Sequence, residues 1–170
     1  IITLDENGTA TANTDLPFGS YYIKEIATDE HYILSDTQYP FTFEYAGQDT
    51  ETVEIKVNDG KPIENKLIYG SVFGKKIDEN GEALGGALIG IFKADETEYT
   101  KEHAIMTATS EKDGSFSFAK VPYGKWIVRE IEAPTGFVLD DTSYEVNISK
   151  NEQVIEVEIA NEYIHGNIQL

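Results

Sequence analysis

The chain has 170 residues, of which 40% are hydrophobic and 11% aromatic, a composition that suits one large or two small folded domains and not a disordered chain. Its formal net charge of −18 is spread over both halves, which argues against binding to nucleic acid or to anionic lipid, because both need clustered Lys and Arg. The chain has no cysteine, so it can form neither a disulfide nor an internal thioester.

The first 66 residues predict short strands separated by turns. Aromatic and branched residues alternate with polar ones, which is typical of half-buried strands, and an Asp-Glu-Asn-Gly and an Asp-Gly sequence mark turns. No helix signal competes with this pattern. The strands expected here cover residues 1–4, 9–13, 21–25, 39–45, 53–57 and 63–65.

The rest of the chain continues in the same way. An Asp-Gly turn at 113–114 predicts a hairpin that joins a strand over 106–109 to a strand over 115–119. Residues 94–104 are polar and predict a loop. The other strands expected here cover residues 70–78, 89–92, 144–148 and 154–161.

The stretch 124–137 predicts a strand that runs into a turn containing Pro and Gly. Alternation with a period of two places Glu130 on the same face as Trp126 and Val128. A carboxylate that faces a core is costly unless it is paired, or protonated and hydrogen-bonded. The alternative register leaves Glu130 in solvent and turns three other residues inward, namely Ile127, Arg129 and Ile131; from this strand alone, both registers stay open.

This stretch occurs twice. Residues 19–32 align with 124–137 at an offset of 105, which matches Glu25 with Glu130. Residues 65–74 align with 161–170 at an offset of 96, which matches Asn65 with Asn161. Repeats of this length indicate tandem domains. We therefore expect a domain over 1–66 that lacks its first strand, a complete domain over 67–163, and the start of a following repeat over 164–170.

The residues around Glu130 resemble a known family motif. The pattern Gly-x-Tyr-x-x-x-Glu-x-x-Ala-Pro-x-Gly-Tyr, here with Trp126 and Phe137 in place of Tyr, is similar to the glutamate motif of Cna protein B-type (SpaA-like) repeats. These repeats occur in pilins and adhesins of Gram-positive bacteria. The copy around Glu25 lacks the Ala-Pro-x-Gly portion. The resemblance implies an all-β fold of tandem antiparallel β-sandwiches, immunoglobulin-like or transthyretin-like.

In that family, a glutamate assists the formation of a Lys–Asn isopeptide bond inside the domain. The family's Lys-x-Asp spacing favours Lys76 as the nucleophile, Asn161 ends the apolar face of the last expected strand, and Glu130 would carry the proton. The matching positions of the first domain are Glu25 and Asn65, and its nucleophile would lie upstream of residue 1.

Burial would suit this chemistry, because it lowers the pKa of an amine and raises that of a carboxyl group. We expect an aromatic wall around the three residues, formed by Trp126, Tyr144 and Phe92. The alternative is a buried Lys–Glu salt bridge beside a hydrogen-bonded Asn161.

Other kinds of site find little support. The three histidines, His31, His103 and His165, lack the spacing of metal ligands, and no nucleophile elbow is present. We expect no metal, no cofactor and no enzymatic turnover beyond a single self-crosslinking step.

The expected function is that of a structural stalk or shaft module in a Gram-positive adhesin or pilin, secreted and anchored to the cell wall. Its partners would be neighbouring repeats of the same chain, with no nucleic acid and no membrane insertion of this segment. The alternative is an adhesin module that contacts a host extracellular-matrix protein or glycan through loops 94–104 or 46–51, with Tyr99 or Tyr45 exposed.

Overall fold

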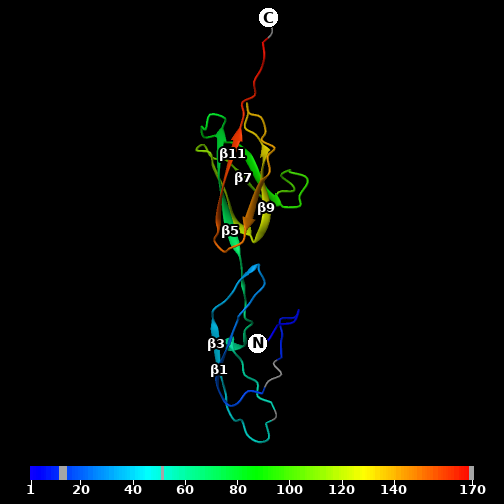
Figure 1. The fold of residues 1–170 in the computed structure, drawn as a ribbon, viewed down its shortest axis with the longest axis vertical. Coiled ribbons are helices and arrows are strands. Elements are labelled where there is room, and N and C mark those ends of the chain that lie inside the picture. Colours follow the sequence, from blue (N-terminus) through cyan, green and yellow to red (C-terminus); the bar gives the residue numbers. More distant parts are fainter. Residues whose placement is uncertain (12–14, 51, 169–170) are drawn as a thin grey trace. The chain divides into compact units, whose positions relative to one another are not determined.

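The computed structural model describes residues 1–11, 15–50 and 52–168, and nearly all of its regular structure is β-strand (Figure 1). The chain divides into two compact units. Unit 1 contains residues 1–28 and 34–65, and unit 2 contains residues 29–33 and 66–170.

Unit 2 is a β-sandwich. A four-stranded sheet has the strand order β10-β9-β6-β7, and a three-stranded sheet has the order β11-β5-β8. The four-stranded sheet consists of β6 (Leu88–Lys93), β7 (Met106–Thr109), β9 (Gly124–Glu132) and β10 (Tyr144–Ile148). The three-stranded sheet consists of β5 (Tyr69–Asp78), β8 (Ser115–Pro122) and β11 (Val154–Asn161). A short ladder between β2 (Tyr32–Ile33) and β4 (Lys66–Leu67) completes the unit.

The core of unit 2 lies between its two sheets. Period-2 alternation turns Ile89, Ile91 and Val128 of one sheet toward Val72 and Ile159 of the other, and all five side chains are fully buried. The all-β sandwich fold expected from the sequence is therefore confirmed.

Two details of unit 2 differ from the expectation. The strand pairing is not antiparallel throughout, because β11 runs parallel to β5 (Figure 1). In this parallel pair, Ile159 lies opposite Lys76. The predicted hairpin over 106–119 is wrong, because β7 pairs with β6 in one sheet whereas β8 pairs with β5 in the other. The Asp-Gly turn is present, but it carries the chain from one sheet to the other.

Unit 1 has less regular structure than its sequence predicts. Its ladder joins β1 (Gly19–Lys24) to β3 (Gln38–Phe43), and η1 (Asn58–Gly60) is a single 3-10 turn. The strands predicted over 1–4, 53–57 and 63–65 do not form, and part of the one predicted over 9–13 lies outside the described residues. Among the described residues of unit 1, no segment takes the central position that β5 holds in unit 2, so these segments lack a strand to pair with.

Candidate functional site

Three polar side chains are buried together with the core of unit 2. Lys76 on β5, Glu130 on β9 and Asn161 on β11 retain 0%, 1% and 1% of their exposure. Each lies at an inward position of its strand, in step with apolar neighbours such as Val72 on β5 and Ile159 on β11. The register that turns Glu130 inward is thus the one that the structure adopts.

Glu130 lies between the other two residues. Its Oε2 accepts a hydrogen bond from Asn161 Nδ2 at 2.6 Å, and its Oε1 lies 3.9 Å from Lys76 Nζ. A distance of 3.9 Å exceeds the length of a charge-assisted hydrogen bond, which is about 2.7–2.9 Å. The structure therefore brings the three residues predicted from the sequence into one cluster, in which the carboxyl group touches the amide and approaches the amine.

The Lys76 amine donates its hydrogen bonds to backbone carbonyls. Its Nζ lies 3.0 Å from the carbonyl oxygen of Ile159 and 3.3 Å from that of Ile77. A neutral amine has two N–H donors and one lone pair, so these two acceptors satisfy both donors and leave the lone pair free. An ammonium would have a third N–H without an acceptor at hydrogen-bond distance.

Two buried oxygens of the cluster, Glu130 Oε1 and Asn161 Oδ1, have no hydrogen-bond partner among the described residues. An unpaired buried oxygen costs about 1–3 kcal/mol, so such atoms are uncommon in folded proteins. A proton on the carboxyl group of Glu130 would supply a donor at this position.

The surroundings shift the pKa values in the direction that favours neutral groups. Burial lowers the pKa of Lys76, although the nearby carboxylates of Glu130 and Asp140 act in the opposite direction. Burial raises the pKa of Glu130, although hydrogen bonds from Asn161 and from the backbone of Asp140 oppose it. Desolvation thus dominates for both residues.

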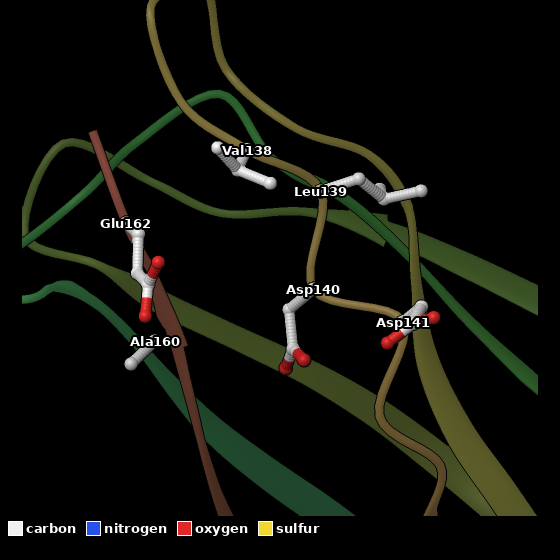
Figure 2. Close-up of a pocket in the computed structure, with 6 residues that line it drawn as sticks. All are labelled: Val138, Leu139, Asp140, Asp141, Ala160 and Glu162. Carbon is white, nitrogen blue, oxygen red and sulfur yellow. The ribbon is translucent and has the colours of Figure 1, made fainter. Parts of the chain in front are cut away.

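The segment from Val138 to Asp140 also contacts the site, and nothing in the sequence reasoning singled it out. The carbonyl oxygen of Val138 accepts a hydrogen bond from Asn161 Nδ2 at 2.5 Å, and the N–H of Asp140 donates to Glu130 Oε2 at 2.8 Å. Figure 2 shows this segment passing beside the end of β11, where Ala160 and Glu162 form the other wall of a pocket. The only sequence signal was the Pro-Gly turn just before it.

The predicted aromatic wall is correct in part. Trp126 and Tyr144 pack against the core cluster, and the hydroxyl of Tyr144 donates to Asp140 Oδ2 at 2.7 Å. Phe92 is buried on the other face of its sheet, because it alternates with the inward-facing Ile91, and it packs edge-on against Tyr99 at a centroid distance of 5.1 Å. On the inner face, the sequence reasoning missed two aromatic side chains of β8, Phe116 and Phe118, and the ring of Phe116 lies directly over Gly74 of β5.

Unit 1 brings its two matching residues together as well. Asn65 Nδ2 donates to Glu25 Oε1 at 2.6 Å and to Thr28 Oγ1 at 2.7 Å. The N–H of Ser35 donates to Glu25 Oε2 at 3.0 Å, as the N–H of Asp140 does to Glu130 in unit 2. Both Glu25 and Asn65 are only half-buried.

The loop over 94–104 folds back onto its own unit. Tyr99 packs against Phe92, and the guanidinium carbon of Arg129 lies 4.4 Å from the centre of the Tyr99 ring. Tyr45 in unit 1 is 62% exposed and lies edge-on to Phe18. Of the two aromatic side chains considered for ligand contact, only Tyr45 is therefore exposed.

The fold and the site define a class of protein: a β-sandwich with a buried Lys–Glu–Asn cluster that spans its first and last strands. The family model that matches the chain is SpaA, described as a prealbumin-like fold domain, over residues 1–61 and 70–163. The chain belongs to this family, which confirms the resemblance found in the sequence.

Two solved structures, the TIE protein and GBS52, show the same fold, and a third, BcpA, matches only part of the chain. The Bacillus anthracis TIE protein matches with a TM-score of 0.73 and 23% identity over 96% of this chain, which spans 28% of that protein. GBS52, the minor pilin of Streptococcus agalactiae, matches with a TM-score of 0.50 and 19% identity over 99% of this chain and 70% of its own. BcpA, the major pilin subunit of Bacillus cereus, matches 54% of this chain at 27% identity, with a TM-score of 0.47, and 28% of its own length is covered. A comparison with curated proteins finds no match.

Across the described part of the chain, no helix has the length and apolar character needed to cross a membrane. Within the same ranges, His, Asp and Glu side chains form no group of three that could hold a metal ion.

Proposed function

We propose that Lys76 and Asn161 form an intramolecular isopeptide bond, with Glu130 as the proton shuttle, and that the chain serves as a shaft module of a Gram-positive surface protein. The observation that carries this proposal is the burial of the three side chains in one cluster, with Glu130 bonded to Asn161 at 2.6 Å and 3.9 Å from Lys76. The reaction happens once per molecule and modifies the protein itself.

The proposed reaction exchanges one amide for another. The lone pair of Lys76 Nζ attacks Cγ of Asn161, the Cγ–Nδ2 bond breaks, and ammonia leaves. Glu130 donates a proton toward the amide and takes one from the amine, so it ends as it began. The hydrogen bonds of Nζ to two carbonyl oxygens support a neutral nucleophile, and the unpaired Oε1 supports a protonated carboxyl group. Proximity on neighbouring strands supplies much of the rate.

The competing interpretation is a buried salt bridge. In a hydrogen-bonded ion pair, an ammonium N–H would donate directly to the carboxylate. Here Nζ lies 3.9 Å from Oε1 and donates instead to the backbone carbonyl oxygens of Ile159 and Ile77. Buried ion pairs also add little net stability, because desolvation offsets the attraction. Both arguments favour the covalent bond.

The position of the bond suits a module that carries tension. It would join β5, the first strand of the sandwich, to β11, the last strand, close to the same end of both. Force that enters at β5 would cross from Lys76 to Asn161 and leave the unit, so residues 77–160 would lie outside the force path. Without the bond, the hydrogen bonds between the parallel strands β5 and β11 would carry this force in shear.

The proposed setting follows from the family and from the fold. We assign a Cna B-type repeat to 67–163, a repeat without its first strand to 1–66, and the start of a further repeat to 164–170. Membership of the SpaA family and the fold shared with the minor pilin of Streptococcus agalactiae support an extracellular pilus or adhesin shaft, with neighbouring modules as partners. We do not propose ligand binding by loop 94–104, since its Tyr99 covers Phe92.

The test of the crosslink is the intact mass of the purified chain. We expect the wild-type protein to be lighter than its formula by one ammonia, and Glu130→Ala to have the full formula mass. Asp141→Ala serves as the control, because Asp141 is an exposed acid that lines the neighbouring pocket (Figure 2). A wild-type chain of full mass would refute the proposed bond.

A further inference from the structure

We propose that Asp140 is a positioning residue for the crosslinking reaction: its side chain, held by Tyr144, fixes the segment whose backbone orients both Glu130 and Asn161 toward Lys76. This inference rests on the proposed function, because it concerns the geometry of the same reaction.

The backbone of Val138–Asp140 forms one hydrogen bond with Asn161 and one with Glu130. The carbonyl oxygen of Val138 accepts from Asn161 Nδ2, and the N–H of Asp140 donates to Glu130 Oε2. Asn161 Nδ2 also donates a hydrogen bond to Glu130 Oε2 at 2.6 Å. The backbone thus binds Nδ2 of Asn161, the nitrogen that leaves as ammonia, and Oε2 of Glu130. The other oxygen of each side chain, Asn161 Oδ1 and Glu130 Oε1, has no hydrogen-bond partner among the described residues.

This arrangement sets the direction of attack. With Nδ2 fixed toward Val138, the carboxamide of Asn161 cannot exchange its nitrogen and its oxygen by rotation without losing two hydrogen bonds. Intramolecular reactions depend steeply on such orientation, and a shift of about 1 Å can lower a rate about 100-fold. A small movement of Val138–Asp140 would therefore slow the crosslink even in a fully folded protein.

The side chain of Asp140 holds the segment in place. Its Oδ2 accepts from the hydroxyl of Tyr144 at 2.7 Å, and its Oδ1 accepts from the N–H of Thr142 at 3.0 Å. Tyr144 itself lies on β10, opposite Val128 in the ladder with β9, so the hydroxyl is anchored to the strand that carries Glu130. Figure 2 shows Asp140 between Leu139 and Asp141 at the edge of the pocket.

Unit 1 holds its matching Glu–Asn pair by different contacts. At the offset of 105, Ser35 takes the position of Asp140, and its single hydroxyl oxygen accepts from the N–H of Thr37 at 3.3 Å. The amide of Asn65 is held there by the side chain of Thr28, at 2.7 Å, and not by a backbone carbonyl. The second oxygen of Asp140 is what allows the bond to Tyr144.

The ionisation of Asp140 is consistent with this role. Burial by itself raises the pKa of Asp140, but the hydrogen bonds from Thr142 and Tyr144 outweigh it, so the net shift is downward and the carboxylate stays an acceptor. Burial and the bond to Asp140 raise the pKa of Tyr144 to about 12, so its hydroxyl stays a donor.

The experiment measures how fast each variant loses ammonia. The full chain is made in a cell-free translation mixture with a short pulse of isotope-labelled leucine, and its intact mass is followed with time. Asp140→Ser copies the residue of unit 1 and removes the acceptor for Tyr144, whereas Tyr144→Phe removes the donor and keeps the ring. We expect each to slow the loss of ammonia by about 10- to 100-fold. The double variant should be no slower than the slower single variant, because both changes break the same bond.

Two controls separate positioning from charge and from folding. Asp140→Asn keeps one oxygen for the N–H of Thr142 and offers an NH2 group that can donate to the hydroxyl oxygen of Tyr144, so both hydrogen bonds can form without the charge. We therefore expect a rate within about threefold of the wild type. Asp141→Ser changes the exposed neighbour and should leave the rate unchanged. Fluorescence of Trp126, the single tryptophan, reports whether unit 2 is folded in each purified variant.

The outcomes distinguish this inference from the proposed function. A wild-type chain that never loses ammonia would overturn the crosslink itself. A wild-type chain that loses ammonia, with folded Asp140→Ser and Tyr144→Phe variants that lose it equally fast, would overturn the positioning role alone. An Asp140→Asn variant as slow as Asp140→Ser would also overturn it, since the charge and not the hydrogen bond would then matter.

Discussion

The replacement of Lys76 by Met tests how much the crosslink stabilises unit 2. Methionine fills the same apolar position without an amine, so the substitution itself should cost less than about 1.5 kcal/mol in free energy of unfolding. The crosslink closes the loop from residue 76 to residue 161, and the entropy model for disulfide loops of that length gives about 4–5 kcal/mol. We therefore expect Lys76→Met to lose about that much.

The assay is urea unfolding followed by the fluorescence of Trp126. This residue is the only tryptophan of the chain, and it packs against the core of unit 2, so the signal reports that unit alone. A loss of 4–5 kcal/mol corresponds to a midpoint about 2–4 M lower in urea, or to a melting temperature about 20–30 °C lower. Glu130→Gln keeps the lysine and blocks the proton shuttle, so it should lose a similar amount. If Lys76→Met and the wild type unfolded at the same urea concentration, the crosslink would not be what stabilises the unit.

Three further predictions follow from the same geometry. Without the amine, Glu130 keeps a raised pKa, and the stability tied to its protonated form is present at low pH and lost as pH rises through that pKa; Lys76→Met should thus become less stable as pH rises above 4.5, the ordinary pKa of a glutamic acid, and adding Glu130→Gln should abolish this trend in urea titrations. In force spectroscopy on the chain held at both ends, unfolding of Lys76→Met should release residues 77–160, an extra length on the order of 30 nm that the wild type never shows. Identical force–extension curves for the two proteins would exclude the proposed force path. Gly74→Ala places a Cβ inside the ring of Phe116 and should cost about 1–3 kcal/mol in the Trp126 assay, whereas Gly166→Ala meets no atom within 4 Å and should cost none.

The candidate site was predictable because strand periodicity and the family resemblance point to the same three residues. Lys76 is in step with Val72, and Asn161 is in step with Ile159, so apolar neighbours identify the inward face of each strand. For Glu130 the strand alone left two registers open, and the repeat with the matching Glu25 favoured the buried one. Periodicity thus identified the inward positions, but the repeat was needed to choose the register of Glu130 and the family's Lys-x-Asp spacing to choose Lys76.

The contacts that sequence reasoning missed come from segments without periodicity. Val138 and Asp140 lie between β9 and β10, in an irregular stretch where backbone groups rather than side chains make the decisive hydrogen bonds. A hairpin over 106–119 was expected because an Asp-Gly turn usually joins paired strands, but the turn here changes sheets. Phe92 was placed in the wall by its aromatic character, although its alternation with Ile91 turns it to the other face. In unit 1, strand-like sequences stay irregular because a strand also needs a partner.

The most direct test of the account is a tryptic digest of the wild-type chain analysed by tandem mass spectrometry. An amidated Lys76 resists trypsin, so the account predicts one branched species in which the peptide of residues 76–93 is joined to the peptide of residues 151–170, with the combined mass less one ammonia. Fragment ions should place the junction at Lys76 and Asn161. Recovery of free peptides 77–93 and 151–170, cut after Lys76, would contradict it.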